Sequence, residues 1–272
     1  MASLLERELE ANAFCWRIVR ADGVCLGFTS HDRDLEVDGL VYRAAPGMMP
    51  SAVSLSDGFD PASLDVAGAL SSAAITEADL GAGRWDGADL TLFLTSWEAP
   101  GAERVVLAEG RIGEVAVKGN GFEAELRGMT ALLDRPVVEQ TSPECRAELG
   151  DPRCRVDMAG RTLVTRVAAL VDEDEVEVEA VTGPANAYAY GRLRWISGAN
   201  SGLVSALLSS AGSRLRLREA PAFSASVGDL LEIREGCDKG FATCTGRFAN
   251  GANFRGEPHL PGMDLLTRYP GA

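Results

Sequence analysis

Short segments that alternate apolar and polar residues dominate this sequence, and glycine, aspartate or proline interrupts them at close intervals. The stretch CWRIVRADGVCLGFTS predicts two strands joined by a turn at Asp22-Gly23, and DLEVDGLVYRAA repeats the pattern around Asp38-Gly39. Further strands are expected at ASLDVAGAL, ADLTLFLTSW, RVVLAEGRIGEVAVKG and GFEAELRG. This period of two predicts a β-rich N-terminal domain over residues 1–140.

Three short segments of this first domain have helical features instead. SLLERELE at 3–10 and TALLDRPVV at 130–138 place apolar residues at helical spacing, and the second should end before Pro136. TEADLGAGRWDG at 76–87 predicts a short helix or a turn between strands. We therefore expect helices only as brief connections in a mainly β fold.

A second β-rich region begins at Arg161. Six short strand candidates follow at close intervals: TLVTRVAALV, EVEVEAV, YGRLRWIS, LVSALLSS, RLRLRE and DLLEIRE. This spacing favours a small barrel or a sandwich. We assign residues 156–235 to such a domain, inserted between two cysteine-bearing segments.

Four cysteines bracket the inserted domain in two pairs, Cys145 with Cys154 and Cys237 with Cys244. Four thiolates suit either zinc or an iron-sulfur cluster, and the gaps within the pairs are longer than most structural zinc sites use. Two disulfides, or four unrelated buried thiols, are the alternatives. Because no secretory signal precedes the first domain, we expect reduced thiols. Residues 141–155 and 236–272 then form one cysteine-ligated region.

Charge and composition limit the classes of function. The formal net charge is −14, and a chain without a basic stripe is not expected to bind nucleic acid nonspecifically. The same charge is compatible with a passage through which DNA slides, because such a wall should repel phosphates. No apolar run reaches the length of a membrane-spanning helix, so we expect a soluble chain.

Enzyme activity is not expected. His31-Asp32 resembles half of a metal site, but the only other histidine is His259 near the C-terminus, and no catalytic fingerprint of a known class occurs. An iron-sulfur redox enzyme is the remaining alternative from this class. Cys15 and Cys25 flank the first turn and are expected to be buried free thiols rather than a disulfide.

The sequence after Cys244 is rich in glycine, asparagine and proline and shows no periodicity. We expect the tail from Arg247 to Gly262 to dock on a neighbouring subunit or on a partner protein, with Arg255, Phe248 and Phe254 in the contact. Deletion of residues 246–272 is then expected to leave the monomer folded.

The stretch GCDKGFATCTGRFANGANFRGEPHLPG resembles the C-terminal signature of a phage tail protein family that includes the hub protein of bacterial gene transfer agents. GFTSHDRDLEVDGLVYRA and ITEADLGAGRWDGADLTLFLTSW resemble the first domain of that family, so the resemblance spans nearly the whole chain. The cysteine spacing is also similar to that of tail tip protein L of phage lambda, which carries an iron-sulfur cluster. The resemblance implies a cluster, 4Fe-4S in type, with zinc as the alternative; its ligands would be Cys145, Cys154, Cys237 and Cys244.

The resemblance further implies a structural role at the tail tip or baseplate of a phage-like particle that is assembled in the bacterial cytoplasm. The implied assembly is a homotrimeric ring below the ring of the distal tail protein, leading toward a central tip protein. A tail-associated peptidase is a further candidate partner. DNA would pass through the ring without sequence-specific binding, and whether the particle is a phage or a gene transfer agent is open.

Overall fold

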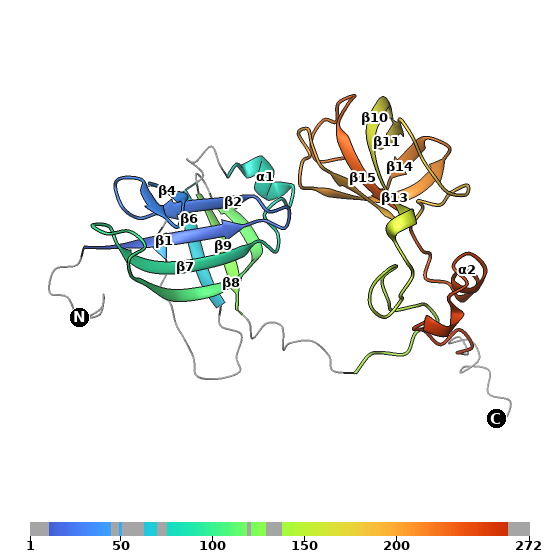
Figure 1. The fold of residues 1–272 in the computed structure, drawn as a ribbon, viewed down its shortest axis with the longest axis horizontal. Helices are drawn as coiled ribbons and strands as arrows, with labels where there is room; N and C mark the ends of the chain where they lie inside the picture. Colours follow the sequence, from blue (N-terminus) through green and yellow to red (C-terminus); the bar gives the residue numbers. More distant parts are fainter. Residues whose placement is uncertain are drawn as a thin grey trace. The chain divides into compact units, whose positions relative to one another are not determined.

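The computed structural model describes residues 11–44, 49–50, 63–69, 75–118, 121–128 and 138–260. The chain divides into two compact units, Met1–Val137 and Val138–Ala272. Both units are mainly β (Figure 1), which confirms the predicted fold class. The helix expected at 3–10 lies outside the described residues, as does all but the last residue of the one expected at 130–138.

The first unit contains a nine-stranded sheet in the order β3-β4-β2-β1-β7-β8-β9-β6-β5. Its strands are β1 (Asn12–Val19), β2 (Cys25–Thr29), β3 (Leu35–Val37), β4 (Leu40–Ala44), β5 (Met49–Pro50), β6 (Ser63–Ala69), β7 (Asp89–Ser96), β8 (Arg104–Lys118) and β9 (Gly121–Arg127). Neighbouring strands are antiparallel except β2 and β4, which run parallel.

The two Asp-Gly turns form where the sequence predicts them. Gly23 has a φ of +89° between β1 and β2, and both residues of the β3–β4 loop have positive φ, 52° at Asp38 and 76° at Gly39. A two-residue hairpin loop with two positive φ angles matches the right-handed twist of its strands, and Asp-Gly tolerates these angles well. The turn residues therefore fix the β3–β4 register.

The first unit buries side chains on both faces of its sheet. One cluster gathers around Trp16, Phe28, Trp85 and Leu92 and includes Leu80 of helix α1 (Glu77–Gly81). Thr76 caps that helix, because its hydroxyl accepts the N–H of Asp79 at 3.1 Å. A smaller cluster lies on the opposite face, where alternate residues of β1 and β7 point, and contains Ala13, Cys15, Leu35, Val37, Tyr42 and Phe93.

The second unit contains a closed six-stranded barrel in the order β10-β11-β14-β13-β12-β15. Its strands are β10 (Thr162–Asp172), β11 (Glu175–Val178), β12 (Arg192–Trp195), β13 (Val204–Ala211), β14 (Arg214–Leu217) and β15 (Leu230–Arg234). Of the two architectures expected from the strand spacing, the barrel is therefore the one adopted. Its interior is filled by fully buried side chains: Leu193, Leu207, Leu215, Leu217, Leu231 and Ile233.

Strand β10 closes the barrel by pairing with two neighbours in turn. Thr162–Arg166 pairs with β15, and beyond Val167 the strand pairs with β11 across shifts in register. Such irregularities bend a strand and increase its twist. The bend allows β10 to pair with β15 along its first half and with β11 along its second half. The chain therefore enters and leaves the barrel at the same end, because the start of β10 pairs with the end of β15.

Two largely irregular segments flank the barrel. The first, residues 138–161, ends in η2 (Ala159–Arg161), and the second, residues 235–260, contains α2 (Phe241–Gly246) and η3 (Gly251–Asn253). Figure 1 shows both segments beyond one end of the barrel, where β10 begins and β15 ends. Among the described residues, none of the helices has the length and apolarity needed to cross a membrane.

Candidate metal centre

Backbone hydrogen bonds join the two cysteine-bearing segments side by side. The N–H of Cys145 donates to the carbonyl of Lys239 at 2.9 Å, and the N–H of Arg146 donates to the carbonyl of Arg255 at 3.0 Å. Lys239 also donates its ammonium to the carbonyl of Ala147 at 2.6 Å. Residues about 90 to 110 positions apart are thus held in contact, which brings the first cysteine pair to the second.

A carboxylate organises the turn that carries Cys154. Asp151 accepts the backbone N–H groups of Cys154 at 2.6 Å, Arg153 at 2.8 Å and Glu148 at 3.0 Å. Desolvation by burial acts to raise the pKa of Asp151, but these three donors outweigh it and hold the pKa below its usual value. The orientation of Cys154 therefore depends on an ionised Asp151.

The second pair is arranged by the residues between its members. Cys237 follows the end of β15, and Cys244 lies on α2 and is buried. Asp238 accepts the backbone N–H of Gly240 at 2.9 Å and the hydroxyl of Thr243 at 2.7 Å. These bonds turn the chain directly after Cys237 and lead it into α2, so that both thiols lie at the same end of the barrel.

The four thiols lie within electrostatic reach of one another. Burial raises the pKa of Cys244, and the charges of Cys145, Cys237 and Cys154 raise it further. Burial also raises the pKa of Cys237, with a smaller contribution from Cys145 in the same direction. Cys154 and Cys244 are 9% and 7% exposed. Cys145, Cys154 and Cys237 are therefore near enough to Cys244 to influence it, and Cys154 and Cys244 are the buried members of the set.

Donors point at two of the sulfurs. The backbone N–H of Arg255 donates to Sγ of Cys145 at 3.4 Å, and the side-chain amide of Asn250 lies 3.7 Å from Sγ of Cys154. The same amide donates to the carbonyl of Cys154 at 2.6 Å. N–H groups directed at sulfur stabilise thiolates and tune bound iron-sulfur clusters. The donor set of four soft sulfurs therefore fits either zinc or an iron-sulfur cluster in its chemistry.

The thiols do not form a closed coordination shell. Within the part of the chain that the structure describes, no group of three or more histidine, cysteine, aspartate or glutamate side chains is close enough to hold a metal ion. Electrostatic interaction between the thiols extends over a longer distance than a metal-ligand bond. The thiols can therefore influence one another's pKa without being close enough to share a metal ion.

A buried carboxylate connects this region to the barrel. Glu235, directly after β15, is 4% exposed in its side chain and forms ion pairs with Arg161 at 2.7 Å and Arg247 at 2.6 Å. Arg247 also donates to the carbonyls of Gly236 at 3.0 Å and Ala187 at 2.8 Å. Because Arg247 follows α2, this junction fixes the cysteine-bearing helix to the end of the barrel.

The C-terminal tail packs on its own unit as far as the structure describes it. Glu257 accepts two hydrogen bonds from the guanidinium of Arg146, at 2.7 and 2.9 Å, and one from the N–H of Ser142 at 2.9 Å. The Arg146 bonds, with the Ser142 bond, lower the pKa of Glu257 to about 2. Phe254 stacks edge-on against Phe241 at 5.0 Å. Residues 247–260 therefore pack against their own unit, and docking of the tail on a partner stays a prediction.

The two histidines lie in different units, and the ring of His259 lies 6.4 Å from that of Phe241 on α2. His31 belongs to the first unit, where it stacks on Trp97 at 5.3 Å and contacts Asp32 at 3.2 Å, whereas His259 belongs to the second. Strand register sets Cys15 opposite Thr29 rather than opposite Cys25. All six cysteines are free thiols in the structure.

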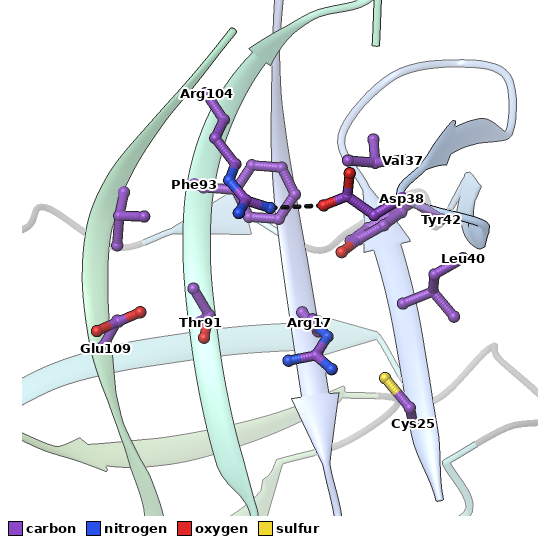
Figure 2. A pocket seen from close by; sticks show the side chains of 11 residues that line it. Arg17, Cys25, Val37, Asp38, Leu40, Tyr42, Thr91, Phe93, Arg104 and Glu109 are labelled. Carbon is purple, nitrogen blue, oxygen red and sulfur yellow. Dashed lines mark hydrogen bonds and ion pairs between the residues drawn. The ribbon is translucent and has the colours of Figure 1, made fainter. Parts of the chain in front are cut away.

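Sequence reasoning missed a pocket on the first unit. Figure 2 shows it on the face of β1, β2, β4, β7 and β8, where Arg104 pairs with Asp38 at 2.7 Å across its upper part. Its volume is about 380 Å³, and Arg17, Thr91 and Glu109 stand in one row across the strands. Burial raises the pKa of Tyr42, which also lines it, to about 12. The Asp-Gly turn that places Asp38 was the only signal of it in the sequence.

Comparisons with known proteins agree on a tail component. Residues 1–157 match a family described as baseplate hub protein, N-terminal attachment domain, and residues 186–264 match one described as phage conserved hypothetical protein BR0599. A solved chain from the virion of a native gene transfer agent particle is 38% identical, with a TM-score of 0.84; the match covers 98% of this chain and 94% of that one. The search of curated proteins found no match.

Proposed function

We propose, from the premise that this chain belongs to the baseplate hub family of phage-like tails, that its barrel is held in place by a four-cysteine iron-sulfur cluster. The observation that carries the proposal is the convergence of two cysteine pairs from opposite ends of the barrel sequence. Cys145, Cys154, Cys237 and Cys244 would hold the cluster. When bound, it supplies a crosslink of metal-thiolate bonds between the two segments.

The protein's own residues prepare this crosslink. Asp151 and Asp238 shape the turns that present the thiols, and the N–H groups of Arg255 and Asn250 lie against two of the sulfurs. A particle protein assembled in a reducing cytoplasm cannot rely on disulfides, whereas a thiolate cluster is stable there. Zinc in the same position is the alternative, since its ligand chemistry is also satisfied by four thiolates.

We infer that copies of the hub form a homotrimeric ring below the distal tail protein ring, with the central tip protein beyond it and a tail-associated peptidase as a further candidate partner. Two findings support this assembly: the N-terminal match is to an attachment domain, and the similar solved chain is part of a virion. DNA passes through the ring without sequence-specific contacts. The formal net charge of −14 favours passage over binding, since phosphates are repelled by an acidic wall.

Particle assembly tests the structural role of the cluster. We expect Cys154→Ser particles to lose DNA delivery, because Cys154 is a nearly buried member of the set. Cys25→Ser is the matched control, since Cys25 is a free thiol of the first unit and should leave delivery unchanged. Cys154→Ser particles with complete tails and normal delivery would show that the cluster is not structural.

A further inference from the structure

One outer wall of the barrel is rich in arginine. Arg192 and Arg194 alternate outward along β12, and Arg234 of β15 lies directly opposite Arg192 in the ladder. On the other side of β12, Ala206 of β13 lies opposite Arg192. We name Arg192, Arg194 and Arg234 the arginine wall. In a chain with a net charge of −14, such a concentration of cations is unusual.

Partners for the arginine wall are few within one copy. Glu232 pairs with Arg194 at 3.1 Å and with Arg234 at 2.9 Å. Among the described residues Arg192 is exposed and has no ion-pair partner, and it stands beside the like charge of Arg234. Like charges opposite each other in a ladder are unfavourable. The wall therefore keeps an excess of positive charge.

A second wall carries the opposite charge. The turn from β10 to β11 places Asp172, Glu173, Asp174 and Glu175 in succession, and Glu177 follows on β11. These five residues form what we call the acidic wall. Arg216 offsets part of the charge by pairing with Asp174 at 3.0 Å, and Arg214 lies opposite Glu177 in the ladder. Arg218 also lies nearby, because the N–H of the preceding Leu217 donates to the carbonyl of Asp174 at 2.7 Å. Five carboxylates against three guanidiniums still leave an excess of negative charge.

The two walls lie on different sides of the barrel. In the closed order β10-β11-β14-β13-β12-β15, three steps in either direction separate β11 from β12. The acidic wall therefore cannot neutralise the arginine wall of the same copy. Both surfaces also carry exposed aliphatic side chains: Val164 and Val204 flank the Arg194–Glu232 pair at 55% and 57% exposure, and Leu170 and Val171 precede the acidic turn at 49% and 42%.

We propose that the occupant of the arginine wall is the acidic wall of a second copy of this chain. A contact between two different patches of the same chain is heterologous, and it closes into a ring where the rotations from copy to copy add up to a full turn. Aliphatic groups beside the charges contribute apolar area to the contact, and the charges set partner and register. The proposal rests on the proposed role as a ring component and names the surface by which copies meet.

Sedimentation velocity of the full chain at low and moderate salt tests this contact. The wild-type chain should associate with rising concentration, and less so as salt increases, because salt screens exposed charges. Arg192→Glu and Glu173→Arg should each weaken association about fivefold, since an exposed pair contributes up to about 1 kcal/mol. Both side chains lie at the surface, so neither reversal disturbs the core. Arg111→Glu, in an exposed ion pair of the first unit, is the control and should associate like wild type.

Mixing the variants gives the sharpest result. An Arg192→Glu copy retains its acidic wall and a Glu173→Arg copy retains its arginine wall, so an equimolar mixture should recover association that neither variant shows alone. Absence of association in the wild type, unchanged association in both variants, or a mixture without recovered association would overturn the proposal. Loss of duplex DNA binding by Arg192→Glu, with association unchanged, would overturn it by assigning the arginines to phosphates. Iron and sulfide content should be unaffected in every variant, which separates this contact from the cluster.

Discussion

Replacement of Glu235 tests whether one buried carboxylate joins the cysteine region to the barrel. Its side chain is 4% exposed and accepts from Arg161 and Arg247, which are 29% and 23% exposed. Removing one partner of a buried ion pair costs about 3–5 kcal/mol, because the remaining charges lose their partner without regaining full hydration. Both arginines have some access to water, so we expect the lower value, about 3 kcal/mol, for Glu235→Ala.

Hydrogen exchange in the full chain measures this cost locally. A loss of about 3 kcal/mol corresponds to exchange roughly 100-fold faster at amides that open with the junction. We expect the acceleration at β10 and β15, which begin and end there, and at the N–H of Cys244, which donates to Gly240 at 3.0 Å on α2. Amides of β7 in the first unit should be unchanged.

Glu232→Ala is the matched control. Glu232 also pairs with two arginines, Arg194 and Arg234, but these are 47% and 36% exposed and lie on the outer wall. Exposed ion pairs contribute up to about 1 kcal/mol, so exchange should accelerate by less than about fivefold. Equal effects of the two substitutions, or an effect of Glu235→Ala confined to β15, would refute the reasoning that Glu235 joins two parts of the unit.

Three further substitutions test other parts of the second unit. The pKa of Glu257 is about 2, below its ordinary value of about 4.3, so its contribution to stability is present above pH 4.3 and lost as the pH falls through 2. The Glu257→Gln variant should therefore be less stable than wild type at pH 7 but equally stable near pH 2. A difference in stability that does not depend on pH would contradict this. Leu215→Ala should cost about 2–5 kcal/mol in urea unfolding, because Leu215 is fully buried, and a cost under about 1 kcal/mol would mean that the barrel core is loosely packed. Gly236→Ala should prevent folding of the second unit, as judged by circular dichroism, because its Cβ would collide with the backbone of Ala189 and Gly191; a native spectrum would contradict that contact.

Local features of the fold were predictable from the sequence. The alternation in TLVTRVAALV and RLRLRE identified barrel strands, because one face of each strand must be buried and the other exposed. Asp38 and Gly39 identified a hairpin turn, because few residue pairs tolerate two positive φ angles. Four cysteines in two pairs identified the candidate ligands. In each case the signal lies within a few neighbouring residues.

Features that depend on distant pairing were not predictable. The period of β10 does not show that its first half pairs with β15 and its second half with β11, which is what closes a barrel rather than a sandwich. The tail after Cys244 has no periodicity, so nothing local indicated that Glu257 binds Arg146 of its own unit. The sequence does not distinguish Glu235 from the other acidic residues. Its ion pairs are with Arg161 and Arg247, which come from different segments.

The central claim is that four cysteines from both sides of the barrel hold one iron-sulfur cluster, and metal analysis tests it most directly. The measurement is iron, zinc and acid-labile sulfide on the full chain, purified without oxygen, together with a visible absorption spectrum. The account predicts iron and sulfide at about four per chain, both lost in Cys154→Ser and retained in Cys25→Ser. Zinc at about one per chain, or neither metal, would contradict the cluster.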